Sequence, residues 1–541
     1  MQEKKEISRR GFMKGAAVTA IGAGIAGSLA ACTPDVPDEP ARDPKLPESW
    51  DDEYDVVVVG YGGAGAATAI TACDAGATVL ILESMAEPGG NTHISGGGFL
   101  CPNDETKSLT YIRGLFDLCL AVYDDEVVKV YNKNLMTTKS WLEGLHPSIK
   151  TTRYGGAGFP SVSGSESQDK YQLNPLTGTP YEGLTAPQAL FNLMADSAES
   201  RGADVWLEAP GKRLITDSMG VVCGVVVGTK NGDRNVKAKK GVVLTCGGYE
   251  FNDEMLRNYC KGAPIYASGS IGNTGDGIKL AVAVGADLWH MTGASCGLAI
   301  KTPDYPSTMG NAGASTGTSA GTIYVDKEGE RFILETGIEA HAGLLVVDYY
   351  DQEELMYPRI PCFNICDSKK ADVRALGNGG SGYTRVYKYT WSTDNKAELA
   401  KGWIYSDTTI AGLANKIGCN AANLQKEIAK WNEMVDKGVD EEFGRAANTL
   451  GKIDTPPYYA SKLYPSLLNT QGGPRRNAKA EVINPFGEPI PRLYSSGELG
   501  SLWGVVYQGA GNNAESIVFG RIAGANVAAL DSWDEEPVVE E

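Results

Sequence analysis

The sequence predicts an α/β fold in which a Rossmann-like domain is formed from both ends of the chain and an α+β capping domain is inserted between them. Three observations predict it. A strand–helix–strand unit with a glycine-rich turn opens the folded part, short strands and a buried helix recur near the C-terminus, and the middle is richer in aromatic and charged residues. With 541 residues and 42% hydrophobic content, the chain is long enough to bury more than one core.

The first unit is YDVVVVGYGGAGAATAITACDAGATVLILE, residues 54–83. Its apolar runs predict a buried strand at Val56–Val59 and a second at Val79–Leu82, and the small residues between them predict a helix. A strand, a helix and a strand within about 30 residues are typical of a nucleotide-binding unit.

Four glycines and one acidic residue give this unit its function. Gly60 permits a tight turn, Gly62 lets the backbone approach a pyrophosphate, and Gly65 lets the helix pack close to the strand. Gly63 lies at the start of the helix, whose N–H groups attract a phosphate. Glu83 follows the second strand and suits a ribose diol. The pattern predicts a dinucleotide site.

The other predicted elements lie far along the chain. Val242–Thr245 is a buried strand that ends in two glycines, RLYSSGELGS (492–501) is a short strand, and NNAESIVFGRIAGANVAAL (512–530) is a final helix. LANKIGCNAANLQKEIAKWNEMVDKG (413–438) predicts a helical stretch in the capping domain. The predicted boundaries are 53–300 and 455–533 for the Rossmann-like domain, 301–454 for the capping domain, and 534–541 for an acidic tail.

The N-terminus predicts export. A twin arginine at Arg9–Arg10 precedes an Ala- and Gly-rich apolar run, which is the layout of a twin-arginine signal peptide over residues 1–31. The run ends in LAAC, which resembles a lipobox and predicts a lipid anchor at Cys32, on the outer face of the cytoplasmic membrane in the cell envelope. Cleavage at an A-x-A-like site is the alternative. Residues 32–52, rich in Pro and acidic residues, predict an extended tether.

Charge and cysteine content exclude several classes of function. The net charge of -18 disfavours nucleic acid as a partner, because nucleic-acid binding needs clustered basic residues. Eleven cysteines fall mostly in apolar segments and are expected to be small buried side chains. Cys362 and Cys366 lack a second pair of ligands, so no metal site is predicted.

Further motifs carry a family resemblance. GGNTHISGGGFLCPN, NTGDGIKLAVAVGADL, GERF and LYSSGELG follow the glycine-rich turn in this order. Together they resemble the fumarate reductase and 3-ketosteroid dehydrogenase group of FAD enzymes (FAD-binding type 2). The resemblance implies bound FAD, a substrate held between the flavin and the capping domain, and hydride exchange between flavin N5 and a carbon–carbon bond. It assigns FAD contacts to Gly90, Asn91, Thr92, Ser95, Gly96, Gly97, Gly248, Asp276, Glu498, Asn512 and Asn513.

Differences within the group indicate the branch. Fumarate-type members use arginines and histidines to bind two carboxylates and to protonate the substrate, whereas this chain has Asn469, Glu339 and Tyr507–Gln508 at those places. YQGAG is similar to the Tyr-Pro-Gly-Ala-Gly of the ketosteroid branch, in which the tyrosine hydroxyl and the last glycine N–H bind the ketone oxygen. The resemblance gives this role to Tyr507 and Gly511, and two such donors would form an oxyanion hole.

The residue that handles the proton has several candidates. The position of the family's acid or base aligns with Glu339, which is either catalytic or a solvated surface glutamate. Tyr154, Tyr171, His341 and Tyr383 are further candidates, and spacing alone does not rank them.

These observations predict an exported FAD-dependent oxidoreductase that acts on a C=C or C–C bond conjugated to a carbonyl, of the enone or 3-ketosteroid type. The reducing direction is favoured, with electrons from an external quinone or cytochrome partner. The substrate is expected to be a small hydrophobic carbonyl compound. One alternative is a reductase of an unsaturated carboxylate such as fumarate, urocanate or an acrylate, and another is a non-catalytic flavin electron carrier.

Overall fold

The computed structural model describes residues 43, 45–311, 321–336, 341–378 and 389–534. From Pro44 onward the chain forms one compact unit, distinct from Met1–Asp43, and both main sheets belong to it. The predicted signal peptide, Cys32, most of the acidic tail, Glu339 and Tyr383 lie outside the described residues.

Parallel strands form the centre of the first sheet. Its strands are β1 (Asp52–Val59), β2 (Val79–Leu82), β6 (Asp204–Trp206), β7 (Gly211–Thr216), β8 (Val222–Thr229), β9 (Gly232–Leu244), β20 (Glu481–Ile483) and β21 (Pro489–Ser495). The order β6-β2-β1-β9-β21 is parallel throughout, and β20, β7 and β8 join in antiparallel pairs. A strand from near the C-terminus thus lies beside one from the middle of the chain, which confirms that both ends build the Rossmann-like domain.

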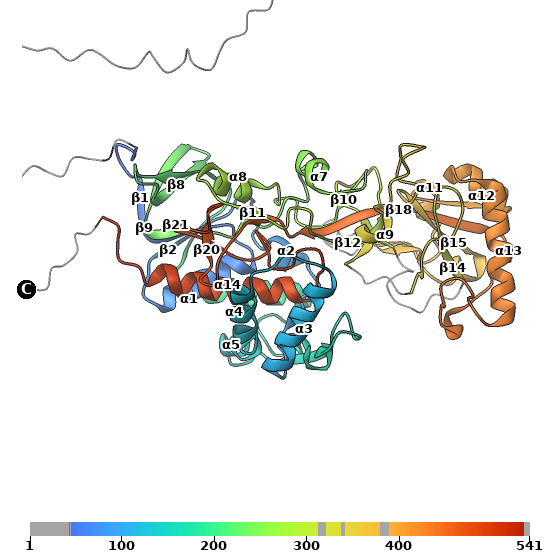
Figure 1. Cartoon of the computed structure of the whole chain (residues 1–541), viewed down its shortest axis with the longest axis horizontal. Helices are drawn as coiled ribbons and strands as arrows, with labels where there is room; N and C mark the ends of the chain where they lie inside the picture. The colour runs from blue at the N-terminus through green and yellow to red at the C-terminus, as the bar shows by residue number, and fades with distance from the viewer. Residues whose placement is uncertain (1–42, 44, 312–320, 337–340, 379–388, 535–541) are drawn as a thin grey trace, which may run out of the picture. The chain divides into compact units, whose positions relative to one another are not determined.

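The core of this sheet is apolar on both faces. Val56–Val59 of β1 are at most 5% exposed, as expected for a parallel sheet that is covered on each side. One cover consists of α1 (Gly63–Asp74) and α14 (Gly511–Ala528), which Figure 1 shows side by side. A Cβ on Gly524 would lie 2.5 Å from the Thr68 carbonyl oxygen, so a larger residue there would push the two helices apart.

Among the described residues, seven further helices and two small sheets surround this sheet. The helices are α2 (Gly90–Ile94), α3 (Glu105–Leu118), α4 (Asp125–Leu135), α5 (Thr138–Gly144), α6 (Ala186–Glu199), α7 (Asp253–Tyr259) and α8 (Asp276–Ala283). A three-stranded sheet contains β3 (Phe99–Leu100), β4 (Thr151–Gly155) and β5 (Lys170–Leu173), and β11 (Leu288–Trp289) pairs with β19 (Gly473–Pro474).

The second sheet is mixed and extends beyond the predicted boundaries of the capping domain. Its strands are β10 (Tyr266–Ala267), β12 (Ala294–Ile300), β13 (Met309–Asn311), β14 (Thr322–Val325), β15 (Cys362–Asp367), β16 (Gly377–Asn378), β17 (Ile404–Asp407) and β18 (Tyr458–Thr470). Because β12 and β18 pair over Ala294–Ile300, strands that precede 301 and follow 454 contribute to it. The boundaries at 301 and 454 stay predictions.

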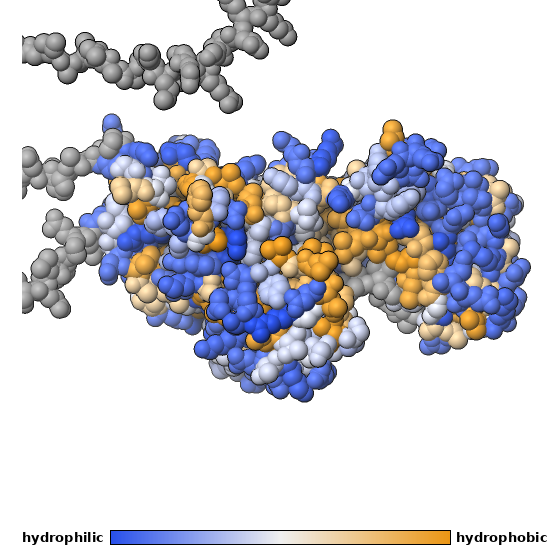
Figure 2. Space-filling view, in the orientation of Figure 1, coloured by the Kyte–Doolittle hydropathy of each residue, from blue (hydrophilic) through white to orange (hydrophobic). Residues whose placement is uncertain are grey.

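The predicted helical stretch of the capping domain is two helices, α12 (Ile410–Ile417) and α13 (Ala421–Lys437). Gly418 ends α12 in the left-handed conformation (φ +75°) and Asn420 caps α13 by accepting from the Asn423 N–H, which is the usual chemistry of a helix end and a helix start. Trp431 faces inward, and Figure 2 shows a largely hydrophilic surface over these helices. Short α9 (Gly343–Val347), α10 (Ser368–Ala371) and α11 (Lys396–Ala400) complete this part.

Two further findings concern membrane-spanning helices and the cysteines of the described residues. Within the described ranges no helix is long and apolar enough to cross a membrane. All ten cysteines of those ranges are free thiols, and most are buried, as expected for small core side chains. Cys362 and Cys366 both lie in β15 and are fully enclosed.

Candidate active site

A cavity of about 450 Å³ lies where β1, β2 and β9 end, the place where open α/β sheets bind ligands. The predicted residues that line it are Gly60, Gly62, Gly63, Glu83, Gly90, Asn91, Thr92, Ser95, Gly96, Asp276, Glu498, Tyr507, Asn512 and Asn513. Gly65, Gly97, Gly248 and Gly511 are not part of this lining, and Glu339 lies outside the described residues.

The turn between β1 and α1 leaves room for a pyrophosphate. Gly60 has φ +109°, and a Cβ on Gly65 would lie 2.1 Å from the Gly60 carbonyl oxygen, so Gly65 packs the helix on the turn as predicted. A Cβ on Gly62 would meet only the Gly89 carbonyl oxygen, at 3.7 Å. Its other side is open to the cavity, where a phosphate can approach the backbone and the N-terminus of α1.

Glu83 is held in place at the end of β2. One carboxylate oxygen accepts from the Tyr61 N–H at 2.9 Å and the other from the Met85 N–H at 2.8 Å. Each oxygen keeps acceptor capacity toward the cavity. This arrangement fits a ribose diol.

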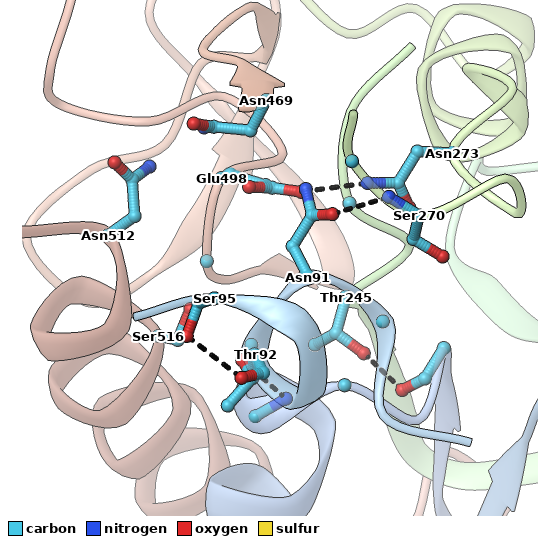
Figure 3. Close-up of a pocket in the computed structure, with 18 of the residues that line it drawn as sticks. Asn91, Thr92, Ser95, Thr245, Ser270, Asn273, Asn469, Glu498, Asn512 and Ser516 are labelled. Carbon is cyan, nitrogen blue, oxygen red and sulfur yellow. Dashed lines mark hydrogen bonds between the residues drawn. The ribbon is translucent and has the colours of Figure 1, made fainter. Parts of the chain in front are cut away.

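Four polar side chains from distant parts of the chain meet on one side of the cavity. Asn91 Nδ2 donates to Glu498 Oε1 at 2.7 Å and to Glu250 Oε1 at 2.9 Å, and Asn273 Nδ2 donates to the same two oxygens at 3.0 and 2.7 Å. Figure 3 shows Asn91, Asn273 and Glu498 gathered in this way. Burial raises the pKa of Glu250 to about 7, and burial with the neighbouring Glu250 raises the pKa of Glu498 well above its ordinary value.

Loop 95–98 and the start of α14 are tied together. Asn513 Nδ2 donates to Ser95 Oγ at 3.1 Å and to the Gly98 carbonyl at 2.9 Å, and Ser95 Oγ donates to the Thr92 carbonyl at 2.9 Å. Asn512 Nδ2 donates to Gln471 Oε1 at 2.9 Å. These contacts hold the N-terminus of α14 at the cavity, where its partial positive charge stabilises an anionic group.

Tyr507 and Gln508 point in different directions. Tyr507 lines the cavity, and its hydroxyl accepts from the Asn512 N–H at 3.4 Å. Gln508 is fully buried and accepts from the Tyr111 hydroxyl and from the Gly158 N–H. Of the two residues at the place of the family's carboxylate-binding arginine, only the tyrosine faces the cavity.

Gly511 begins α14 behind the cavity wall. Its N–H donates to the Gln508 carbonyl at 2.8 Å, and a Cβ on it would lie 2.7 Å from the Trp503 ring. The structure therefore places the N–H that was predicted to bind a ketone oxygen in a turn hydrogen bond.

The structure shows which of the described candidates for proton transfer line the cavity. Tyr154 and His341 line the cavity. Tyr171 does not, because its ring packs on Phe99 with centroids 6.3 Å apart. Tyr383, like Glu339, falls outside the described ranges.

Glu335, three residues after the motif GERF, belongs to a buried ion-pair network in the capping domain. It is 2% exposed and forms ion pairs with Arg331 and Arg445, and Arg331 also pairs with Asp440. A fully paired buried network of this kind fixes the chain that leads into residues 337–340.

Sequence reasoning did not single out Lys170, Asn273 or Glu250. Asn273 opens the motif NTGDG but was given no role. Lys170 lines the cavity, and a Cβ on Gly509 would lie 3.3 Å from Lys170 Nζ and 3.0 Å from His341 Cε1. Lys170 follows no motif, so only the fold brings it here. Glu250 did carry a signal, since it is an acid two residues after Gly247–Gly248, the glycine pair that follows β9.

The comparisons agree with this geometry. The family model described as "FAD binding domain" matches residues 55–514. Digoxin reductase of Eggerthella lenta is 27% identical over 98% of this chain and 98% of its own, and urocanate reductase of the same organism is 28% identical over 90% of this chain and 76% of its own.

The fold has a close counterpart among solved structures. The crystal structure of 3-ketosteroid delta1-dehydrogenase from Sterolibacterium denitrificans superposes with a TM-score of 0.77 at 22% identity, covering 88% of this chain and 100% of that one. The family match extends over most of the chain and includes the glycine turn, Glu83 and the start of α14. The chain therefore belongs to the FAD-binding domain family and is an FAD-dependent oxidoreductase of the fumarate reductase and 3-ketosteroid dehydrogenase group.

Proposed function

We propose that this flavoenzyme reduces a carbon–carbon double bond that is conjugated to a ketone. The observation that carries the proposal is the pair Tyr507 and Gln508, because a phenol faces the cavity where an arginine would bind a carboxylate. Among the described residues, no arginine lines the cavity. FAD, when bound, supplies the hydride.

The chain's own part is to stabilise the charge that develops on the ketone oxygen. Tyr507 lies at the N-terminal end of α14, with its hydroxyl 3.4 Å from the Asn512 nitrogen. A hydroxyl donor beside a helix N-terminus suits an oxygen that gains negative charge. The Gly511 N–H donates to the Gln508 carbonyl and Gly511 does not line the cavity, so the oxyanion donor in this proposal is the Tyr507 hydroxyl alone.

The carbon next to the ketone must then receive a proton. Tyr154 and His341 line the same cavity as Tyr507, so either can reach a substrate bound there. Glu339 stands at the position of the family's acid or base and is a further candidate, with a solvated surface glutamate as the alternative.

An unsaturated carboxylate is the second candidate substrate, and Lys170 is the observation that favours it. Its ammonium group and the ring of His341 both approach Gly509 at the cavity wall. A cation at this place would attract a carboxylate, whereas a ketone needs only a hydrogen-bond donor.

The deciding experiment uses the purified holoenzyme, reduced viologen as the electron donor, and a panel of enones, ketosteroids and acrylates. We expect turnover of enones or ketosteroids. The Lys170→Met variant should turn these substrates over at a rate within about threefold of the wild-type rate. Lys139→Met is the matched control, because Lys139 lies over the Tyr171 ring and outside the cavity lining. Turnover of acrylates alone, lost in Lys170→Met, would establish the second candidate. No turnover with FAD bound would indicate an electron carrier.

We further propose that the enzyme works at the outer face of the cytoplasmic membrane and receives electrons from an external quinol or cytochrome. The twin arginine and LAAC support export and a lipid anchor at Cys32. Replacing Arg9–Arg10 by two lysines should leave the protein in the cytoplasm, and Cys32→Ser should release exported protein from the membrane fraction. Membrane-bound Cys32→Ser protein would contradict the anchor.

A further inference from the structure

Two buried carboxylates share the same two hydrogen-bond donors at the wall of the cavity. Glu250 comes from the loop after β9, and Glu498 follows β21. Each amide group has two N–H bonds, and each of Asn91 and Asn273 gives one to Glu250 Oε1 and one to Glu498 Oε1, at 2.7 to 3.0 Å. The four side chains therefore form one closed unit.

The orientation of Asn91 in this unit is fixed from outside. Its Oδ1 accepts from the Ser270 N–H at 2.7 Å, as Figure 3 shows. A flipped amide would turn its oxygen toward two carboxylate oxygens and its NH₂ toward an N–H donor. The amide can therefore hold only one orientation while both glutamates are present.

The chain makes space for the Glu250 carboxylate. A Cβ on Gly248 would lie 2.7 Å from Glu250 Oε2, and a Cβ on Gly269 would lie 2.4 Å from Glu250 Oε1. Gly248, predicted to contact FAD, instead leaves room for Thr470, whose Oγ1 would lie 2.2 Å from a Cβ on Gly248, and for Glu250. Glu250 is 1% exposed and is not part of the cavity lining, whereas Asn91, Asn273 and Glu498 are.

Besides the two amides, the backbone N–H groups of Gly248, Glu250 and Thr470 donate to the two carboxylates. No ion pair joins either one to a lysine, arginine or histidine of the described chain. The adjacent Tyr249 is buried, which raises the pKa of its phenol and keeps it neutral. Two desolvated carboxylates this close cannot both ionise without strong repulsion, so the pair retains a proton at neutral pH.

We propose that Glu250 is a positioning residue for FAD, which holds Asn91 and Glu498 toward the cofactor while the two carboxylates share a proton. Loss of the shared proton would drive the two carboxylates apart and release the amides between them. FAD binding is then expected to weaken as the pH rises above neutral.

The test measures the FAD dissociation constant of the deflavinated protein by flavin fluorescence between pH 6.5 and 9. For the wild type we expect at least a threefold rise across this range. Glu250→Gln leaves a single carboxylate, so its FAD dissociation constant should change by less than twofold across the same pH range. Glu250→Ala leaves the two amides without a partner, so it should bind FAD at least tenfold more weakly than the wild type at pH 6.5. Glu254→Gln, an exposed position on α7, is the matched control and should follow the wild type.

Two results would overturn the proposal. One is a Glu250→Gln protein whose pH profile runs parallel to that of the wild type. The other is a Glu250→Ala protein that binds FAD as tightly as the Glu254→Gln control. If Glu250→Ala does not fold, by circular dichroism, the pH profile of the nearly isosteric Glu250→Gln decides alone.

Discussion

The imidazole ring of His341 packs edge-on against the phenol ring of Tyr507, with centroids 4.7 Å apart and ring planes at 78°. His341 comes from the segment after the Arg331 network, whereas Tyr507 comes from the loop before α14. Both line the cavity. The contact brings a possible proton carrier to the residue that is proposed to bind the substrate oxygen.

The first prediction concerns this tyrosine. Tyr507→Phe keeps the ring against His341 and removes only the hydroxyl, so FAD should stay bound. Turnover of the preferred enone should fall roughly 100-fold or more, because a donor at a developing oxyanion is lost. Steady-state kinetics with reduced viologen checks this. Tyr171→Phe, outside the cavity lining, should change turnover little, and full enone activity in Tyr507→Phe would remove the role proposed for the hydroxyl.

A second prediction concerns the stability of the helix that carries the site. Arg476 and Glu515 form an ion pair with no exposed side-chain surface, and Glu515 also accepts from Ser501 Oγ at 2.6 Å and the Leu502 N–H at 2.8 Å. Arg476→Met leaves a buried carboxylate without its cation and should cost about 3 to 5 kcal/mol of the free energy of unfolding. Chemical denaturation measures it.

The double variant Arg476→Met with Glu515→Gln is the control for this pair. It removes the unpaired charge, so it should be more stable than Arg476→Met alone. A double variant that loses the sum of both single effects would show that the two residues act independently.

A third prediction is a pH effect on the deflavinated protein. Burial raises the pKa of Glu250 to about 7, so between pH 4.5 and 7 the folded protein holds more protons than the unfolded chain. The free energy of unfolding should therefore fall as the pH rises through this window, by about 1.4 kcal/mol per pH unit for such a group. Glu250→Gln should lose less stability over the same window. The prediction would be contradicted if the free energy of unfolding fell equally steeply with pH in Glu250→Gln and in the Glu254→Gln control.

The sequence predicted the first domain well where local pattern and contacts agree. Val79–Leu82 is a strand with those bounds, and the final helix begins at Gly511, one residue before its expected start. Apolar runs between glycines determine both elements, so little depends on distant contacts. The helical stretch predicted at 413–438 is helical but divided into α12 and α13, because Gly418 ends the first helix and Asn420 caps the second.

The candidate site was harder to predict because it is built from contacts over long distances in the chain. Motifs located Asn91 and Glu498, but not Lys170, whose place depends on how β5 lies beside the loop at Gly509. The sequence also did not predict which side chain points into the cavity. Tyr507 and Gln508 are neighbours in the sequence, and only the bonds from Tyr111 and Gly158 to Gln508 show which of them faces the cavity.

The last prediction tests the cavity as the FAD site through a glycine. A Cβ on Gly96 meets no atom within 4 Å, and its φ is not in the left-handed region, so the protein alone tolerates Gly96→Ala. Any loss of FAD affinity must then come from a clash with the cofactor. We expect at least a tenfold higher dissociation constant with an unchanged midpoint of unfolding for the deflavinated protein. Gly144→Ala is the control, because Gly144 is equally open but lies in α5 away from the cavity, and it should bind FAD like the wild type. Unchanged FAD affinity in Gly96→Ala would show that the flavin does not lie against loop 95–98.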